Sequence, residues 1–129
     1  MNEDTKIIWL KRVLLFKMLV VALLFGLPTW IAPEPVLKLL GESLPTPPFY
    51  MRIFGSTQIG LVFLYWLAYK NPLQNRDMVR YAVVDNTVAF ITIITYAILV
   101  GITNPTVWLS AILVLFFAVS FYFLTPRKG

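Results

Sequence analysis

Asp85 is the charged residue whose surroundings in the sequence suit it least. It stands in RYAVVDNTVAF, residues 80–90, and it is the single charged residue of the apolar segment 81–102. An ionised carboxylate at the centre of a bilayer costs about 2.5 to 3.5 kcal/mol and less near the interface, so such a group usually faces the protein and finds a partner. Asp85 therefore needs either a partner or a function.

Lys17 is the natural partner of Asp85. At about 1.5 Å per residue, Asp85 lies about 7 Å inside its apolar segment, and Lys17 lies at nearly the same depth in the first segment. These positions predict a structural ion pair that joins the first segment to the third. Two alternatives stay open: Asp85 is a protonatable or ligand-binding carboxylate, or Lys17 extends its ammonium group to the membrane surface.

A second group of polar residues lies at the start of another apolar segment, in MRIFGSTQIG, residues 51–60. Arg52 and Gln58 could form the rim of an outward-facing pocket for an anionic or carbonyl-bearing head group, because the guanidinium carries forked donors. Tyr96, near the outer end of the third segment, is the third predicted ligand contact. It could equally be an aromatic anchor at the membrane interface.

Small residues in the same stretch predict a helix-packing face. Ser56 and Gly60 are four positions apart, so on a helix they share one face, and Gly55 lies beside them. Small side chains at this spacing let another helix approach closely. We expect Gly55, Ser56 and Gly60 to serve packing.

The chain contains no cysteine and no histidine. Their absence removes thiol nucleophiles, disulfides, iron–sulfur clusters, imidazole metal ligands and histidine-ligated haem. We therefore predict no metal site and no catalytic residue, and we expect a role other than catalysis. No cofactor is expected, with a bound lipid or quinone as the open alternative.

Four apolar segments must position these residues. The chain has 129 residues, of which 59% are hydrophobic and 13% charged, and the segments cover residues 13–32, 53–69, 81–102 and 106–124. Each has the length of about 17 to 25 residues that crosses a bilayer. The sequence predicts an all-α fold: a four-helix transmembrane bundle in one integral membrane domain. The first segment is expected to stay as an anchor, because PTWIAPEP, residues 28–35, is no cleavage site.

The first connection, residues 33–50, differs from the two short turns that join the later segments. It carries five prolines and an apolar stripe. We predict a short helix at about residues 35–40, ended by Gly41, that lies in the membrane interface. The loop is then either a spacer or a lid on a pocket.

The distribution of Lys and Arg predicts the orientation. With the N-terminus in the cytoplasm, nine of the eleven basic residues fall inside and two, Lys38 and Arg52, fall outside. The nine are Lys6, Lys11, Arg12, Lys17, Lys70, Arg76, Arg80, Arg127 and Lys128. This asymmetry predicts a multi-pass protein of the bacterial plasma (inner) membrane with both termini cytoplasmic. Membrane lipids, further copies of the chain or a larger membrane complex are the expected partners, and nucleic acid is not.

The order of several short motifs resembles that of small bacterial four-helix membrane proteins of the DoxX-like and BphX-like kind. The motifs are Gly-x-Pro at 26–28, LLGE at 39–42, Arg-x-x-Gly at 52–55, and Asn-Pro at 71–72 followed by Arg76 and Arg80. The resemblance implies a four-helix membrane fold over nearly the whole chain. For function it implies at most a quinone-linked oxidoreductase subunit or a partner of redox enzymes. The resemblance assigns no cofactor ligands to residues of this chain.

Three functions follow as expectations. The first is a non-catalytic membrane subunit or accessory protein that packs against other membrane proteins or lipids through the second segment. The second is a binding module for a quinone, an isoprenoid or another lipid-like molecule. The third is a small oligomeric proton-coupled transporter that uses Asp85.

Overall fold

The structure, a computed structural model of the chain, describes residues 1–127. All regular secondary structure in this part is helical, which confirms the predicted all-α class. The elements are α1 (Glu3–Val20), the π-helical segment η1 (Val21–Gly26), α2 (Leu27–Ile31), α3 (Glu34–Leu39), α4 (Phe49–Lys70), α5 (Arg76–Val100) and α6 (Pro105–Leu124).

The first three elements form one continuous rod, because the residues at their junctions keep right-handed helical backbone angles. In η1 the N–H of Leu27 donates to the carbonyl of Ala22, five residues back. Pro28 follows directly, and proline has no N–H and crowds the carbonyl four residues before it. The wider π turn accommodates this proline without breaking the rod.

The rod begins at Glu3, ten residues before the predicted apolar segment 13–32. The side chain of Asn2 accepts a hydrogen bond from the Thr5 N–H at 2.8 Å, and Glu3 and Asp4 lie in the first turn. A capping side chain and early acidic residues both stabilise a helix start. The polar residues before the apolar segment therefore extend the helix.

The short helix predicted at residues 35–40 is present as α3. Gly41 follows it with φ of +76°, the N–H of Gly41 donates to Lys38 and the N–H of Glu42 donates to Leu37. This pair of bonds is the Schellman end of a helix, which favours glycine at the left-handed position.

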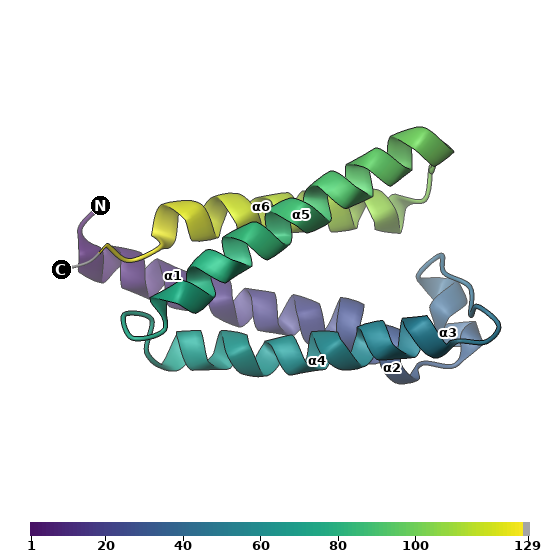
Figure 1. Cartoon of the computed structure of the whole chain (residues 1–129), viewed down its shortest axis with the longest axis horizontal. Helices are drawn as coiled ribbons and strands as arrows, with labels where there is room; N and C mark the ends of the chain where they lie inside the picture. Colours follow the sequence, from purple (N-terminus) through teal and green to yellow (C-terminus); the bar gives the residue numbers. More distant parts are fainter. Residues whose placement is uncertain (128–129) are drawn as a thin grey trace.

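The long helices form two pairs (Figure 1). The α1–α2 rod packs along α4, and α5 packs along α6, while α1 also contacts α6 and so joins the pairs. The pairs lie close together at the end that holds both termini and diverge toward the end that holds α3 (Figure 1). We call these regions the terminal half and the α3 half.

The hydrophobic core lies in the terminal half. Its most deeply buried members are Leu10, Leu14, Val79, Ala82, Phe117 and Phe121, which come from α1, α5 and α6. Phe117 and Phe121 stack with 6.0 Å between their ring centroids, and both are inaccessible to solvent. The packing that joins the two helix pairs is therefore concentrated near the termini.

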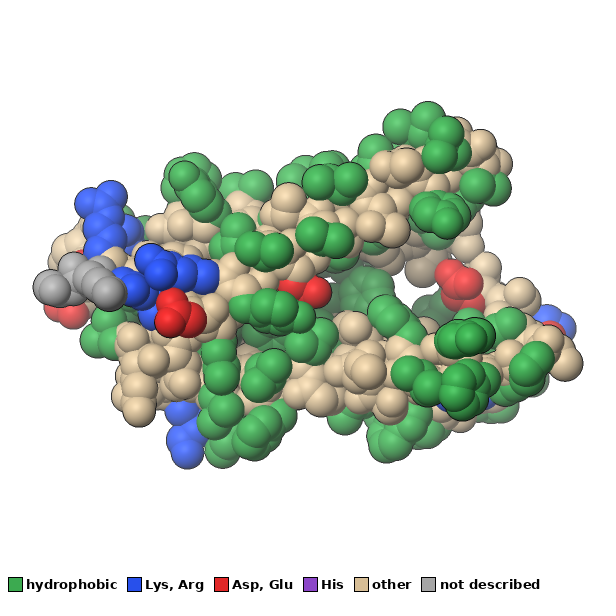
Figure 2. Space-filling model, viewed as in Figure 1, with side chains coloured by type: hydrophobic (Ala, Val, Ile, Leu, Met, Phe, Trp, Pro, Cys, Tyr) green, Lys and Arg blue, Asp and Glu red, His purple; other side chains and the backbone are tan. Residues whose placement is uncertain are grey.

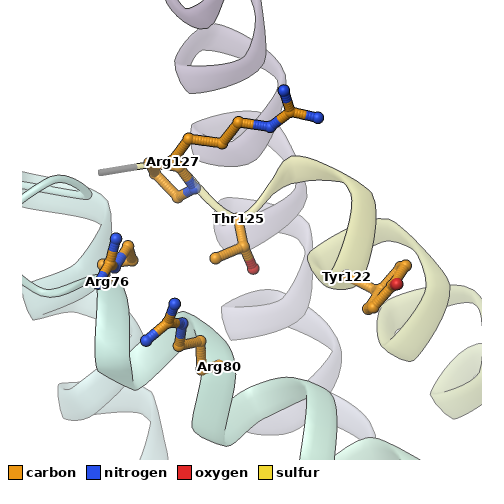
Figure 3. Close-up of a pocket in the computed structure, with 6 residues that line it drawn as sticks. Arg76, Arg80, Tyr122, Thr125 and Arg127 are labelled. Carbon is orange, nitrogen blue, oxygen red and sulfur yellow. The ribbon is translucent and has the colours of Figure 1, made fainter. Parts of the chain in front are cut away.

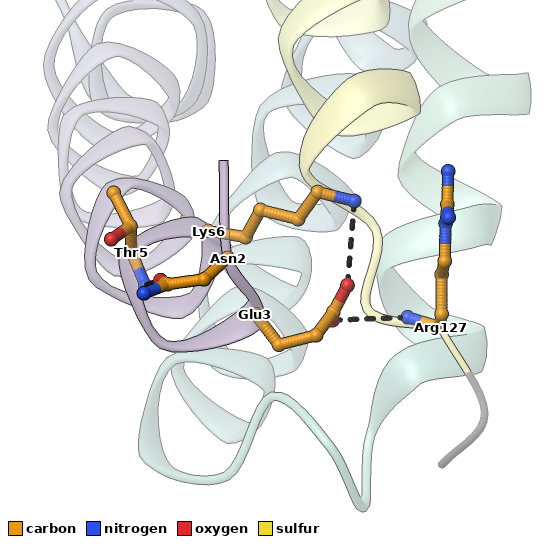
Figure 4. A network of polar contacts seen from close by, with 5 residues as sticks. All are labelled: Asn2, Glu3, Thr5, Lys6 and Arg127. Carbon is orange, nitrogen blue, oxygen red and sulfur yellow. Dashed lines mark hydrogen bonds and ion pairs between the residues drawn. The ribbon is translucent and has the colours of Figure 1, made fainter.

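A small polar network ties the two termini together (Figure 4). The carboxylate of Glu3 lies 3.4 Å from the Lys6 ammonium and accepts a hydrogen bond from the Arg127 N–H at 3.4 Å. The start of α1 is thereby joined to the residues that follow α6. Lys128, counted among the inner basic residues, lies outside the described residues.

The outer surface of the helices is largely apolar (Figure 2). Large side chains point outward along the bundle, among them Leu23, Phe63, Ile98, Leu99, Ile112 and Phe123. Within residues 1–127, two helices, α5 and α6, are long and apolar enough to cross a membrane. Of the other two long elements, α1 carries Lys17 and α4 carries Arg52.

Candidate functional site

A buried polar cluster lies where all four long helices meet in the terminal half. The Lys17 ammonium of α1 donates to the Asn86 side-chain oxygen of α5 at 2.6 Å, and only 5% and 1% of these residues are exposed. The ammonium also lies 4.6 Å from the ring centroid of Phe117 of α6 and 5.7 Å from that of Tyr65 of α4. Lys17 thus contacts the three other long helices, and cation–π attraction adds to its hydrogen bond.

Asn86 takes the place that the sequence analysis assigned to Asp85. No ion pair within 4.0 Å joins Lys17 to Asp85 in the described chain, and Asp85 is only half-buried. Neighbouring residues on a helix point about 100° apart, so one of the two can face α1. The predicted direct ion pair is therefore replaced by a lysine–amide hydrogen bond.

The sequence contains a signal that could have identified Asn86. Val79, Ala82 and Asn86 are spaced three and four apart, which places them on one helix face, and the first two are fully buried. Asn86 also donates to the Ala82 carbonyl at 2.7 Å, so its amide uses both a donor and the acceptor. An amide on this buried face therefore indicates a partner for Lys17.

The Tyr65 hydroxyl is a further buried polar atom in this cluster. Among the described residues it has no hydrogen-bond partner, and 4% of Tyr65 is exposed. An unpaired buried hydroxyl costs about 1 to 3 kcal/mol. The ring offsets part of this cost because it stacks against Phe121, with 6.3 Å between the centroids, and lies beside the Lys17 ammonium.

The α3 half contains a large apolar cleft between the two helix pairs. Its volume is about 490 Å³, and Figure 2 shows a hollow at this end between the two layers of the molecule, with hydrophobic side chains inside. The apolar lining consists of Leu24, Phe25, Pro28, Leu37, Leu40, Met51, Phe54, Ile93, Val107, Leu109 and Leu113. The polar lining consists of Thr29, Glu42, Thr106 and Ser110. We call this space the α3 cleft.

The hydroxyl groups in the α3 cleft already donate hydrogen bonds within the protein. Thr29 donates to the Phe25 carbonyl, and Ser110 donates to the Thr106 carbonyl at 2.8 Å. Their oxygens can still accept, and the exposed carboxylate of Glu42 is the charged group of the lining. This arrangement suits a mostly apolar molecule with a small polar end.

The loop after α3 is fastened to the start of α6. The Asn104 amide donates to the Gly41 carbonyl at 2.9 Å, and the Thr106 hydroxyl donates to the Leu40 carbonyl at 2.7 Å. Leu37 of α3 is 1% exposed and lines the cleft. The first connection therefore bridges the two helix pairs and covers one end of the α3 cleft, as a lid would.

The three predicted ligand contacts are not part of this lining. Arg52 donates to the carbonyls of Thr29 at 3.3 Å and Ala32 at 2.8 Å, so its guanidinium caps the end of α2. Gln58 is half-buried on α4, and Tyr96 is 63% exposed on α5. None of the three lines the α3 cleft.

Gly55 points in a different direction from Ser56 and Gly60, which share one face of α4. Gly55 is buried, and a Cβ added there would lie 2.6 Å from the Trp30 Cα, so glycine permits close contact between α4 and α2. Among residues 1–127, nothing would lie within 4 Å of a Cβ at Gly60, and Ser56 is exposed. In the described part of the chain, only Gly55 of the three serves close helix packing.

Searches against family models, curated proteins and solved structures each found no match to this chain. The resemblance to DoxX-like and BphX-like proteins therefore stays a prediction.

Proposed function

We propose that this protein is a non-catalytic, four-span integral membrane protein that binds a lipid-like molecule, such as a quinone or an isoprenoid, in the α3 cleft. The observation that carries this proposal is the cleft itself, with a volume of about 490 Å³ and eleven apolar residues among its fifteen lining residues. Small-molecule sites typically have about 300 to 1,000 Å³ and a mainly apolar lining with a few polar groups.

Four spans fit the dimensions and the exterior of the bundle. With 22 residues, α4 is about 33 Å long, close to the roughly 30 Å of a bilayer core. The α1–α2 rod runs beside α4, and large apolar side chains cover the outside of both. In this arrangement Lys17 is acceptable inside the membrane because it is buried in the bundle and bonded to Asn86.

The orientation is part of the same proposal. The basic residues gather at the terminal end (Figure 2), which we assign to the cytoplasmic side of a bacterial plasma membrane. The α3 cleft then lies in the outer half, where an apolar molecule can enter from the lipid phase. A cysteine introduced at Gln74 should stay unlabelled by an impermeant maleimide in intact cells, and one at Ser43 should react. The reverse pattern would refute the orientation.

Ligand binding can be tested with two tryptophan variants of α6. Leu113→Trp fills the α3 cleft, whereas Ile112→Trp adds the same side chain at a residue that is 65% exposed. Native mass spectrometry with an added short-chain quinone or isoprenol should show a one-to-one adduct for the parent and Ile112→Trp, and little for Leu113→Trp. Equal adducts in all three proteins, or none in the parent, would contradict the proposal.

A second candidate function is assembly with another membrane protein or with a further copy of the chain through α4. The observation that favours it is the open space over Gly60, next to exposed Ser56 one turn away. A small-residue face that the chain leaves uncovered suits close approach of a helix from another subunit. Both functions can coexist, because this face and the α3 cleft share no residue.

A further inference from the structure

A hollow at the terminal end brings basic side chains of α5 next to the end of α6 (Figure 3). Its volume is about 510 Å³, and it is lined by Arg76, Arg80, Tyr122, Thr125, Pro126 and Arg127. Arg76 and Arg80 are four residues apart and therefore lie on one face of α5. Figure 3 shows Thr125 across the hollow from them, while the Arg127 side chain extends away from α5.

The charge of this hollow is positive and incompletely neutralised. Arg80 lies 3.3 Å from the Asp77 carboxylate, but both side chains are exposed, at 58% and 87%. Such surface pairs are weak and exchange easily with other anions. Within residues 1–127, Arg76 has no carboxylate within 4.0 Å. Of the two guanidinium groups, Arg80 thus has one weakly held carboxylate, and Arg76 has none in the described part of the chain.

The position of the hollow indicates which anion it receives. Tyr122 lines the hollow, and the ring of Phe123 lies 5.3 Å from that of Tyr122 between centroids; the two residues are 68% and 66% exposed. An aromatic and apolar surface therefore adjoins the basic one. Exposed aromatic residues next to arginines are typical of the interface between lipid chains and head groups. Arginine binds phosphate through two parallel N–H donors, which suits a phosphodiester.

We propose that Arg76 and Arg80 bind the phosphate of an anionic phospholipid head group, with its acyl chains lying along Tyr122 and Phe123. The site is separate from the α3 cleft. Its binding of a phospholipid does not depend on which molecule the cleft binds. In the proposed orientation it lies in the cytoplasmic leaflet, where basic pockets between helices bind anionic head groups.

The test compares retention of two lipids that have identical chains. Purified protein in detergent is mixed with equal amounts of phosphatidylglycerol and phosphatidylcholine, and bound lipid is counted by native mass spectrometry. The parent should prefer phosphatidylglycerol, and R76Q/R80Q should lower this preference about tenfold. R76K/R80K keeps the charge but loses the forked donors, so its preference should be intermediate.

The control R12Q/K70Q removes two positive charges from the same end of the bundle but outside this hollow. It should keep the preference of the parent. If it loses the preference as much as R76Q/R80Q does, general electrostatic attraction explains the binding and the site is refuted. If inorganic phosphate binds the parent without lipid and displaces phosphatidylglycerol, the site serves soluble phosphate and the lipid assignment is wrong.

Discussion

The terminal half and the α3 half of this bundle differ in how the two helix pairs meet. In the terminal half, one buried lysine contacts all three other long helices, and Phe117 and Phe121 fill the space between them. In the α3 half the pairs diverge, the first connection bridges them through hydrogen bonds to α6, and the cleft lies between. Similar apolar side chains thus build a closed core at one end and an open site at the other.

The comparison indicates that specific polar contacts decide where the pairs close. In the proposed membrane location, apolar side chains pack against lipid as well as against one another, so they do not by themselves select which helices meet. The bond between Lys17 and Asn86 does select which helices meet, because without it the Lys17 ammonium and the Asn86 side-chain oxygen would each be buried without a partner. The α3 half lacks an equivalent contact between α2 and α5 in the described chain.

The largest predicted effect comes from removing the partner of Lys17. Asn86→Leu leaves a buried ammonium without an acceptor and should cost about 3 to 5 kcal/mol in the free energy of unfolding. Lys17→Met leaves only an amide oxygen unpaired and should cost about 1 to 3 kcal/mol. Thermal unfolding in detergent measures both changes.

The double variant of Lys17 and Asn86 is the control for this prediction. It should recover much of the loss, because the apolar replacements leave neither polar group stranded, and the coupling should be about 0.5 to 3 kcal/mol. Additive losses would mean that the two residues act independently and that their bond does not join the pairs.

Two glycines of α4 should respond differently to leucine. Gly55→Leu forces a side chain against the backbone of Trp30 and should destabilise the monomer by about 1 to 3 kcal/mol or more. Gly60→Leu enters open space, so the stability of the monomer should change little. If the α4 face binds another subunit, Gly60→Leu should instead reduce assembly in size-exclusion chromatography, and Leu61→Ile should not.

Thr106→Val tests the connection between the two pairs in the α3 half. It removes the bond to the Leu40 carbonyl while keeping the shape of the side chain, and it should cost about 0.5 to 1.5 kcal/mol. Hydrogen exchange should increase at residues 40–42 and stay unchanged around Lys17. Unchanged exchange at the loop would show that this bond does not hold the lid.

The smallest effect is expected for Asp85→Asn. Asp85 is half-buried and makes no ion pair within 4.0 Å in the described chain, so its neutralisation should change the unfolding free energy by less than about 0.5 kcal/mol. A large loss of stability would support the predicted ion pair between Lys17 and Asp85. Loss of proton-dependent transport with unchanged stability would instead favour the transporter hypothesis.

The helical fold could be predicted from the sequence because long apolar segments bounded by polar turns leave little other choice. The short helix α3 was also predictable, since proline starts and glycine ends such a helix. The start of α1 lies before the predicted apolar segment, because a capping asparagine and an acidic first turn extend the helix through charged residues. The apolar composition of a segment does not by itself predict such polar turns at the start of a helix.

The candidate site was less predictable for two physical reasons. The depth of Lys17 and Asp85 follows from counting residues, but the rotation of each helix about its axis does not, so the choice between Asp85 and its neighbour Asn86 cannot be made from depth alone. The α3 cleft is lined by ordinary residues such as Leu37, Phe54 and Leu113, which become a site only because two helix pairs diverge. The charge of Arg52 predicts a ligand contact, but in the structure its guanidinium caps α2.

The most direct test of this account uses single cysteines on α6, which the cysteine-free chain allows without background. Cysteines at Leu113 in the cleft, at Ala118 in the buried terminal half and at exposed Ile112 are treated with N-ethylmaleimide in detergent, with and without a short-chain quinone or an isoprenol. We predict that the cysteine at Leu113 reacts and is protected by one of the two molecules, that the one at Ala118 does not react, and that the one at Ile112 reacts regardless. Equal reaction at Leu113 and Ala118, or no protection of Leu113 by either molecule, would contradict the account.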